Sequence, residues 1–399
     1  METTKPNNKA LLALAIGGFG IGLTEFVIMG ILPSVASALN VTIAQAGHFI
    51  SAYALGVVVG APLITGISKR ISSRRMLLLL MLWFTVFNTL SAFSPDYFWM
   101  LVFRFLSGLP HGAFFGIGAV IAGKLGRKGK EARAIAIMFS GLTIANVLGV
   151  PLGTYLGNAF SWSLSFLMVG VVGVLTLASL FFWMPAVSSE SAHPDPGNQK
   201  GLKNPAFWAL IALTTIGTGG FFAWYSYIAP LLTEVSGHTA RAVSYAMVLS
   251  GLGMIAGNFI GAKMAERIGA IRSIVTGMGA MSLLLVANAL LAANPAAALV
   301  MCFVIGLATF TLAAPIQMAI INTAKGSEMI ASSMNQSAFN MANASGAFFA
   351  GIPIAMGLGV VYAGVVGAVL AAMGTVIALG IQRIQRRKQY APPAKLAEA

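Results

Sequence analysis

The sequence contains very few charged residues, and acidic residues are the rarest of them. Only 9% of the 399 residues are Asp, Glu, Lys or Arg, whereas an average soluble domain has roughly 25%. Hydrophobic residues make up 58% of the chain. This composition excludes a water-soluble globular fold, and we expect an all-α membrane protein.

Cysteine and the usual catalytic patterns are also scarce. The single cysteine, Cys302, cannot form an intramolecular disulfide, so the sequence does not indicate a redox compartment. Metal-ligand spacings, Ser-His-Asp sets and phosphate-binding loops are missing, and the loops are short. We therefore expect no metal and no other cofactor, and an intramembrane enzyme, a receptor or a channel is disfavoured.

Long apolar segments dominate the chain instead. A membrane-spanning helix needs about 20 predominantly apolar residues, and we predict twelve such helices. The first is longer than the roughly 7 to 15 residues of a signal-peptide core, so we expect it to be retained. The predicted segments are 10–38, 44–67, 76–93, 98–123, 134–157, 164–184, 207–233, 242–264, 274–293, 296–321, 330–354 and 358–381.

The chain repeats itself after 197 residues. Pro33 has its counterpart in Pro230, and Asn146 has its counterpart in Asn343. Two copies of six apolar segments predict two pseudo-symmetric six-helix halves, which is the architecture of many secondary transporters. In such proteins the substrate site lies between the halves, near the middle of the membrane.

Composition places the boundaries of these halves. We predict an N-terminal half over 1–184 and a C-terminal half over 207–382. A polar, Pro- and Ser-rich stretch over 185–206 reads as a cytoplasmic linker, and residues 383–399 as a basic cytoplasmic tail.

The basic residues predict the orientation. Of the 24 Lys and Arg, all except Arg104 and Arg241 lie on one side of the predicted helices. The positive-inside rule places that side, and both termini, in the cytoplasm. The net charge of +14 therefore reflects topology rather than nucleic-acid binding. We expect a monomeric multi-pass protein embedded in the lipid of a bacterial inner (plasma) membrane.

One acidic residue stands apart from the other nine because it lies deep in a predicted membrane helix. This residue is Glu25, and Arg104 lies at a similar depth in the fourth predicted helix. Charged side chains inside a membrane are costly and are usually functional. Arg104 could pair with Glu25 or tune it, and a static bridge between them is the structural alternative. His111, two turns beyond Arg104, could bind substrate or carry a proton, or could simply pack.

Polar and aromatic side chains also suggest a substrate site. Gln336, Asn340 and Asn343 form a stripe on one face of the eleventh predicted helix, and Asn146 reaches a similar depth in the fifth. Amides both donate and accept hydrogen bonds, which suits hydroxyl-rich or uncharged solutes. Amide pairs that merely hold helices together are the alternative. Further candidates for contact with substrate are Gln317, Phe221, Trp224 and Tyr225.

Four stretches in the first half share a family pattern. They read GFGIGLTEFVIMGILP, GHFISAYALGVVVGAPL, RFLSGLPHGAFFGIGA and ANVLGVPLGTYLG. Their order resembles the major facilitator superfamily, and within it the arabinose or sugar efflux branch of the drug:proton antiporter family. The resemblance implies proton-coupled export of a small neutral or amphipathic solute, most directly a sugar, by alternating access. Multidrug efflux, proton symport and passive facilitation remain alternatives.

The loop after the second predicted helix resembles the superfamily's Gly-x-x-x-Asp-Arg-x-Gly-Arg-Arg signature only in part. Lys69 replaces its Asp, Arg70 keeps the Arg, and Arg74 and Arg75 keep the basic end. The second copy retains an acid, Glu266, which precedes Arg267. The resemblance implies a cytoplasmic gate that depends more on this second copy. Both loops could instead anchor the protein at the lipid headgroups.

The fifth predicted helix resembles the glycine- and proline-rich motif of antiporters in the superfamily. Gly149, Pro151 and Gly153 match that motif, but Thr154 and Tyr155 occupy the place of its glycine pair. A proline bends a helix and frees a carbonyl group, while glycines admit a neighbouring helix. We therefore expect these three residues to take part in gating.

Overall fold

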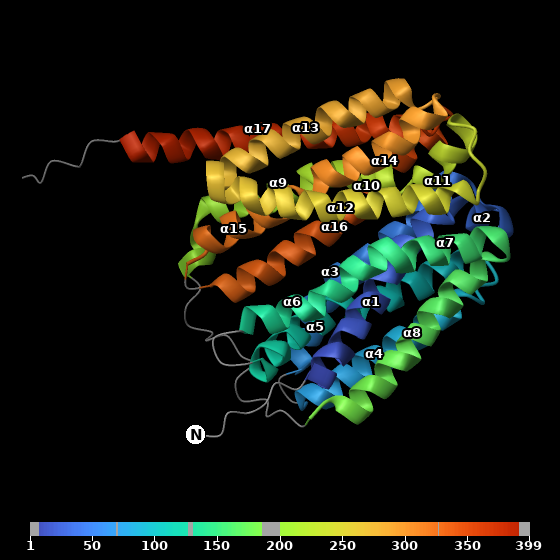
Figure 1. The fold of residues 1–399 in the computed structure, drawn as a ribbon, viewed down its shortest axis with the longest axis horizontal. Helices are drawn as coiled ribbons and strands as arrows, with labels where there is room; N and C mark the ends of the chain where they lie inside the picture. The colour runs from blue at the N-terminus through green and yellow to red at the C-terminus, as the bar shows by residue number, and fades with distance from the viewer. Residues whose placement is uncertain (1–7, 69–70, 127–130, 186–199, 326, 391–399) are drawn as a thin grey trace, which may run out of the picture.

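The computed structural model describes residues 8–68, 71–126, 131–185, 200–325 and 327–390. Within these ranges the regular structure is helical and contains no strand, which confirms the predicted all-α class. Figure 1 shows the helices as a bundle of long, roughly aligned elements. The helices of the first part of the chain are α1 Asn8–Gly30, α2 Leu32–Ala38, α3 Ile43–Ser68, α4 Ser73–Ser91, α5 Tyr97–Leu125, α6 Glu131–Ile144, the π-helical turn η1 Ala145–Gly149, α7 Val150–Ala159 and α8 Trp162–Trp183.

The second part of the chain forms a comparable set. Its helices are η3 Lys200–Lys203, α9 Pro205–Gly217, α10 Gly219–Tyr225, α11 Ile228–Pro230, the π-helical turn η4 Leu231–Val235, α12 Ala242–Ile268, α13 Ala270–Leu291, α14 Pro295–Phe310, α15 Ala313–Thr323, α16 Glu328–Ala355 and α17 Tyr362–Tyr390.

Ten of the described helical stretches are long and apolar enough to cross a membrane. Two further helices, α4 and α16, lie among them but are more polar: α4 has Arg74 and Arg75 in its first turn, and α16 carries the amide stripe. With these two, the described residues contain the predicted twelve membrane segments. The protein is therefore a multi-pass membrane protein.

Several predicted helices are interrupted. The first predicted helix breaks at Ile31, and Pro33 lies in the first turn of α2. The fifth contains the π-helical turn η1, which ends two residues before Pro151. A proline has no N–H to donate, so the regular i to i−4 ladder cannot continue through it. π-Helical turns of this kind occur often at functional sites.

The last predicted helix differs from the structure at both ends. It was expected over 358–381, but α17 begins at Tyr362 and continues to Tyr390. Gly357 and Gly359 precede it with φ of +79° and +100°, which glycine tolerates and other residues rarely adopt. The basic residues after 381 are good helix formers and extend the helix. Residues 186–199 of the predicted linker, and 391–399 of the tail, lie outside the described residues, and the half boundaries stay a prediction.

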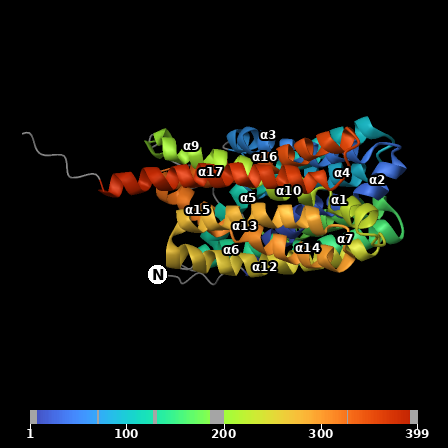
Figure 2. The same cartoon turned by 90° about the horizontal axis from the view of Figure 1, so that it is seen from above.

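The first and second parts of the chain occupy different sides of the molecule. In Figure 1 the blue-to-green helices α1–α8 lie below the yellow-to-red helices α9–α17, and Figure 2 shows the bundle from above. The two sides meet where α16 packs against α3 and where α12 packs against η1 and α7. We call these sides the N-terminal and C-terminal halves.

Equivalent glycines allow close helix packing in both halves. A Cβ atom on Gly60 of α3 would lie 2.1 Å from the carbonyl oxygen of Leu109 on α5. On Gly257 of α12 it would lie 2.2 Å from the carbonyl oxygen of Leu307 on α14. Small residues bring helices together in membranes, where lipid gives little hydrophobic drive for association. Gly60 and Gly257 are 197 residues apart, so the sequence repeat is matched by a packing repeat.

Candidate substrate and proton site

The predicted coupling carboxyl, Glu25, lies at the interface of the halves. It belongs to α1, and its side chain is only 3% exposed. The Nδ2 atom of Asn343, on α16 of the other half, donates a hydrogen bond to Oε1 of Glu25 over 3.5 Å. The structure thus brings together two residues that the sequence identified separately.

The amide stripe of α16 carries unused hydrogen-bond acceptors. Asn343 is fully buried, and its Oδ1 has no partner among the described residues. Asn340, one turn earlier, donates from Nδ2 to the carbonyl oxygen of Gln336 over 3.0 Å, and its Oδ1 also has no described partner. An unsatisfied buried polar atom typically costs about 1 to 3 kcal/mol. A water molecule or a solute hydroxyl could satisfy both oxygens.

Arg104 does not pair directly with Glu25 in the part of the chain that the structure describes. Its Nη1 donates to Oγ1 of Thr24 over 3.0 Å, and its Nη2 donates to the Thr24 carbonyl oxygen over 3.2 Å. The Thr24 hydroxyl in turn donates to Oδ1 of Asn88 on α4. Arg104 therefore fixes Thr24, the residue before Glu25. An ion pair between Arg104 and Glu25 is not found among the described residues, and a tuning role for Arg104 stays a prediction.

Tyr53, which was not among the predicted site residues, contacts both Arg104 and His111. The guanidinium carbon of Arg104 lies 4.4 Å from the centroid of the Tyr53 ring. The Tyr53 hydroxyl lies 3.1 Å from Nδ1 of His111, which is also buried. Its position in a mostly apolar segment could have marked Tyr53 as a site residue, because a buried tyrosine hydroxyl usually needs a hydrogen-bond partner.

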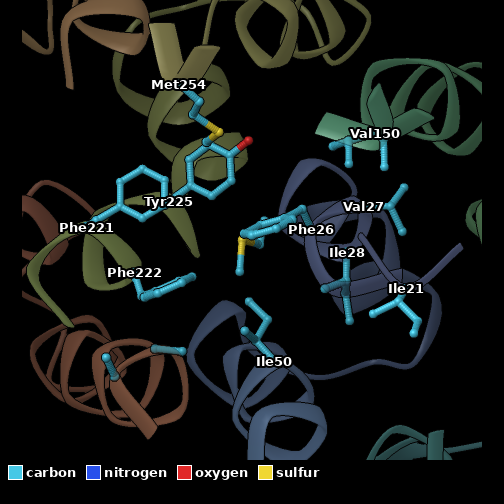
Figure 3. Close-up of a cluster of buried hydrophobic side chains, with 14 of the residues drawn as sticks. Ile21, Phe26, Val27, Ile28, Ile50, Val150, Phe221, Phe222, Tyr225 and Met254 are labelled. Atoms are coloured by element: carbon cyan, nitrogen blue, oxygen red, sulfur yellow. The ribbon is translucent and has the colours of Figure 1, made fainter. Parts of the chain in front are cut away.

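Aromatic side chains from both halves meet at Phe26, the residue that follows Glu25 in α1. Figure 3 shows Phe26 of α1 facing Phe222 and Tyr225 of α10. The Phe26 ring centroid is 6.4 Å from that of Phe222 and 6.0 Å from that of Tyr225. Phe221 stacks on Tyr225 at 4.8 Å. The predicted aromatics Phe221 and Tyr225 therefore lie at or near the interface.

Trp224, predicted to line the same site, lies deeper within the C-terminal half. Its ring packs near Gly364 of α17. Its Nε1 has no hydrogen-bond partner among the described residues. A role for Trp224 in substrate contact stays a prediction.

A cavity of about 160 Å³ lies between the halves. Asn146, in the π-helical turn η1, contributes a buried Oδ1 that has no described partner. The cavity wall contains two amides, a hydroxyl and two phenyl rings, and none of its residues is charged. The lining residues are Phe139, Leu142, Thr143, Asn146, Gly251, Met254, Asn258 and Phe310.

Comparison with known proteins assigns the family. Residues 14–351 match the model of the Major Facilitator Superfamily. The chain belongs to this superfamily. Superfamily members are transporters, so the protein is a transporter and not an enzyme.

Several proteins with different names resemble this chain over most of its length. The inner membrane transport protein YdhP of Escherichia coli (strain K12) is 40% identical over 93% of this chain and 95% of its own. A "Chloramphenicol resistance protein" of Streptomyces lividans is 30% identical over 84% of this chain and 86% of its own. A "Probable sugar efflux transporter" of Mannheimia succiniciproducens is 26% identical over 92% of both chains.

A solved superfamily structure shares the fold. It is a bacterial homologue of the human lysosomal transporter Spinster in an inward-facing, occupied conformation. The TM-score is 0.78 at 17% identity, and the match covers 98% of this chain and 100% of the other. This confirms the predicted all-α superfamily fold.

The predicted gate of this superfamily member lies only partly within the described residues. Lys69 and Arg70 fall outside them. Arg74 donates from Nη2 to the carbonyl oxygen of Phe181 on α8, so it binds within its own half. Arg75 on α4 is exposed, as are Glu266 and Arg267 in the last turn of α12. The gating role of all six basic and acidic residues stays a prediction.

The predicted motif of the fifth helix packs against α1. A Cβ on Gly149 would lie 2.8 Å from Cζ of Phe19, and one on Gly153 would lie 2.7 Å from Cγ2 of Val27. Pro151 lies between them in the first turn of α7. These residues therefore set the distance between α7 and α1.

The two remaining predicted glutamines lie in different environments. Gln317 on α15 donates to Oγ of Ser332 and accepts from Nδ2 of Asn335, both over 2.8 Å, so its amide ties α15 to α16. Gln336 is exposed. For Gln317, helix pairing is the role that the contacts favour over substrate binding.

Proposed function

We propose that the protein is a proton-coupled antiporter that exports a small neutral or amphipathic solute by alternating access, most directly a sugar or a sugar-like compound. The hydrogen bond between Glu25 and Asn343 carries the proposal. It joins the only membrane-embedded acid predicted from the sequence to the opposite half of the protein.

The position of Glu25 supports coupling between the proton and the conformational change. Alternating access moves one half against the other around a central site. A bond between the halves at that site must form or break as they move. Because the charge of Glu25 determines the strength of this bond, protonation shifts the equilibrium between the conformations.

The polar atoms around the interface support a neutral solute. Oδ1 atoms of Asn146, Asn340 and Asn343 are buried acceptors without described partners. They suit a solute that donates hydrogen bonds from hydroxyl groups, and the rings of Phe26 and Tyr225 provide faces on which a sugar could stack. The cavity of about 160 Å³ is below the roughly 300 to 1,000 Å³ of drug-sized pockets. The name of the sugar efflux relative agrees with this class, while that of the chloramphenicol resistance protein keeps drug export as the second candidate.

We further propose the setting in which this transport occurs. The name of the YdhP relative and the distribution of basic residues support an inner (plasma) membrane with both termini in the cytoplasm. The protein acts as a monomer of two six-helix halves, with Glu266 and Arg267 as the main cytoplasmic gate. Lys69 makes the first copy of the gate weaker.

Transport by inside-out membrane vesicles tests the proposal. With an acidic lumen, we expect the wild-type protein to accumulate one of L-arabinose, isopropyl thiogalactoside or chloramphenicol while the lumen becomes more alkaline. A protonophore should abolish the accumulation. Uptake that persists unchanged with the protonophore means passive facilitation, and uptake that requires an alkaline lumen means symport; either result contradicts antiport.

A further inference from the structure

Asn343 presents the two ends of its amide to different surroundings. Its Nδ2 bonds to Glu25, while its Oδ1 is buried and has no described partner. Only the NH₂ group of an amide can donate to a carboxylate, so this arrangement matches the ionised form of Glu25. One side chain thus presents a donor to the proton site and an acceptor elsewhere.

Protonation of Glu25 adds a hydrogen-bond donor at this contact, and that donor needs an acceptor. The ionised carboxylate only accepts hydrogen bonds, whereas the protonated carboxyl carries an O–H that must donate. The bond to Asn343 is the hydrogen bond that the structure gives the Glu25 side chain. If the amide turns by about 180° around its last side-chain bond, Oδ1 accepts from the new O–H and Nδ2 faces the former position of Oδ1.

We propose that Asn343 is the positioning residue that couples the solute to the proton, by rotating its amide when Glu25 gains or loses a proton. The inference rests on the proposed antiport function and deepens it. With Glu25 ionised, Oδ1 of Asn343 is available to a solute hydroxyl. With Glu25 protonated, that acceptor is withdrawn and a donor replaces it, so a solute whose hydroxyl must donate at this point is bound less tightly.

The other ionisable groups near Glu25 are already engaged with other partners. On α5, Arg104 bonds to Thr24. His111, also on α5, and Tyr53 on α3 lie within hydrogen-bonding distance of each other. On α10, the Tyr225 hydroxyl donates to Sδ of Met247 over 3.1 Å. Asn343 is therefore the side chain placed to respond to the charge of Glu25.

Asn340 provides a matched control on the same helix. It carries the same amide and an unpaired Oδ1, but its Nδ2 bonds to the Gln336 carbonyl oxygen, which does not titrate. Asn340 can therefore accept a hydrogen bond from the solute without sensing Glu25. Replacement by Leu, which has a similar shape, removes the amide at either position.

The test measures solute affinity and proton release together, using the solute of the vesicle panel that the wild-type protein exports. In weakly buffered solution, binding to the wild-type protein should release protons, and affinity should fall as the pH falls. Asn343→Leu and Asn340→Leu should each weaken binding by about 5-fold to 150-fold, the cost of one hydrogen bond of about 1 to 3 kcal/mol. Only Asn343→Leu should lose the proton release and the pH dependence. If Asn343→Leu does not fold, Asn343→Ala takes its place.

Two results overturn the inference. Proton release and pH dependence that survive in the Asn343 variant show that Glu25 acts on the solute without this amide. If the Asn340 variant also loses proton release and pH dependence, removal of either amide disturbs them, and they do not depend specifically on the contact between Asn343 and Glu25. Glu25→Gln separates this question from the proposed function: if that variant keeps the wild-type pH dependence, Glu25 is not the coupling group, whatever the role of Asn343.

Discussion

Buried polar side chains form a connected set in the N-terminal half, and Arg104 is at its centre. This guanidinium bonds twice to Thr24 and lies against the ring of Tyr53. A planar guanidinium can make two bonds and stack at once, whereas an ammonium group cannot. Arg104 therefore positions α1, and with it Glu25, relative to α5.

We expect Arg104→Lys to lower the thermal stability of the detergent-solubilised protein. The variant keeps the charge but loses one bond to Thr24 and the stacking on Tyr53. A hydrogen bond to a charged group is worth about 1.5 to 3 kcal/mol, so the melting temperature should fall clearly. Arg75→Lys, at an exposed position of α4, is the control. Equal melting temperatures for the two variants would show that the Thr24 contacts contribute little.

Residue types identified candidates for the site, whose functional roles stay predictions, but their partners could not be read from the sequence. Glu25 and Asn343 stand out because an acid and an amide are rare inside membrane helices. Their contact depends on how α1 and α16 approach each other, which no spacing in the sequence encodes. Tyr53 and Asn88 were missed because a single polar residue in an apolar segment is also compatible with simple packing.

At the scale of the helical elements, side chains at the end of α7 connect the two halves. Asn158 donates to the carbonyl oxygen of Gly30, at the break between α1 and α2, over 3.0 Å. It also donates to the Ala240 carbonyl oxygen, just before α12, over 3.1 Å, and accepts from Ser34 over 2.8 Å. Another bond between the halves runs from Oγ of Ser51 to the Ala344 carbonyl oxygen over 2.8 Å. The bond from Asn158 to Ala240 therefore joins the halves at the end away from the first turn of α1.

Asn158→Ala should shift the conformational equilibrium toward the state open at this end. Loss of one net hydrogen bond of about 1 kcal/mol changes such an equilibrium roughly 5-fold. Spin labels at the exposed residues Phe93 and Leu290, in opposite halves, should report a longer mean distance. Asn294→Ala, which removes an amide that caps α14 within one half, should leave the distance unchanged. A wild-type distance in the Asn158 variant contradicts the account.

A second prediction for the helical elements concerns Glu266 and Lys69 in the proposed cytoplasmic gate. If Glu266 forms the main gate, Glu266→Gln should favour the inward-open state and alter turnover more than Lys69→Gln does. An exposed ion pair is usually worth under about 1 kcal/mol, so the expected shift is several-fold at most. Distances between spin labels on the cytoplasmic ends of α3 and α16 measure it. A shift in the Lys69 variant alone would reverse the proposed roles.

At the scale of the whole molecule, the repeat and the apolar segments predicted the architecture correctly. The twelve segments and the helical class follow from composition, because a bilayer admits few backbone structures. Interruptions at Ile31 and at η1 were missed, since apolar residues continue through both. The late start of α17 was also missed, although Gly357 and Gly359 mark it in the sequence.

The charge distribution predicts a topology that can be measured directly. In a Cys302→Ala background, we expect Thr239→Cys to react with a membrane-impermeant maleimide on intact cells. Lys203→Cys should react only after the cells are permeabilised. Both native residues are exposed in the structure, so burial does not limit the reaction. The reverse labelling pattern would place the termini outside the cytoplasm.

Transport by the Glu25→Gln variant in proteoliposomes shows whether Glu25 couples the proton to transport. The substitution keeps the size of the side chain but removes its charge and its titration. We predict that efflux driven by a proton gradient is lost while exchange of labelled for unlabelled solute, which needs no net proton movement, is retained. Gradient-driven efflux at the wild-type rate in this variant would contradict the account.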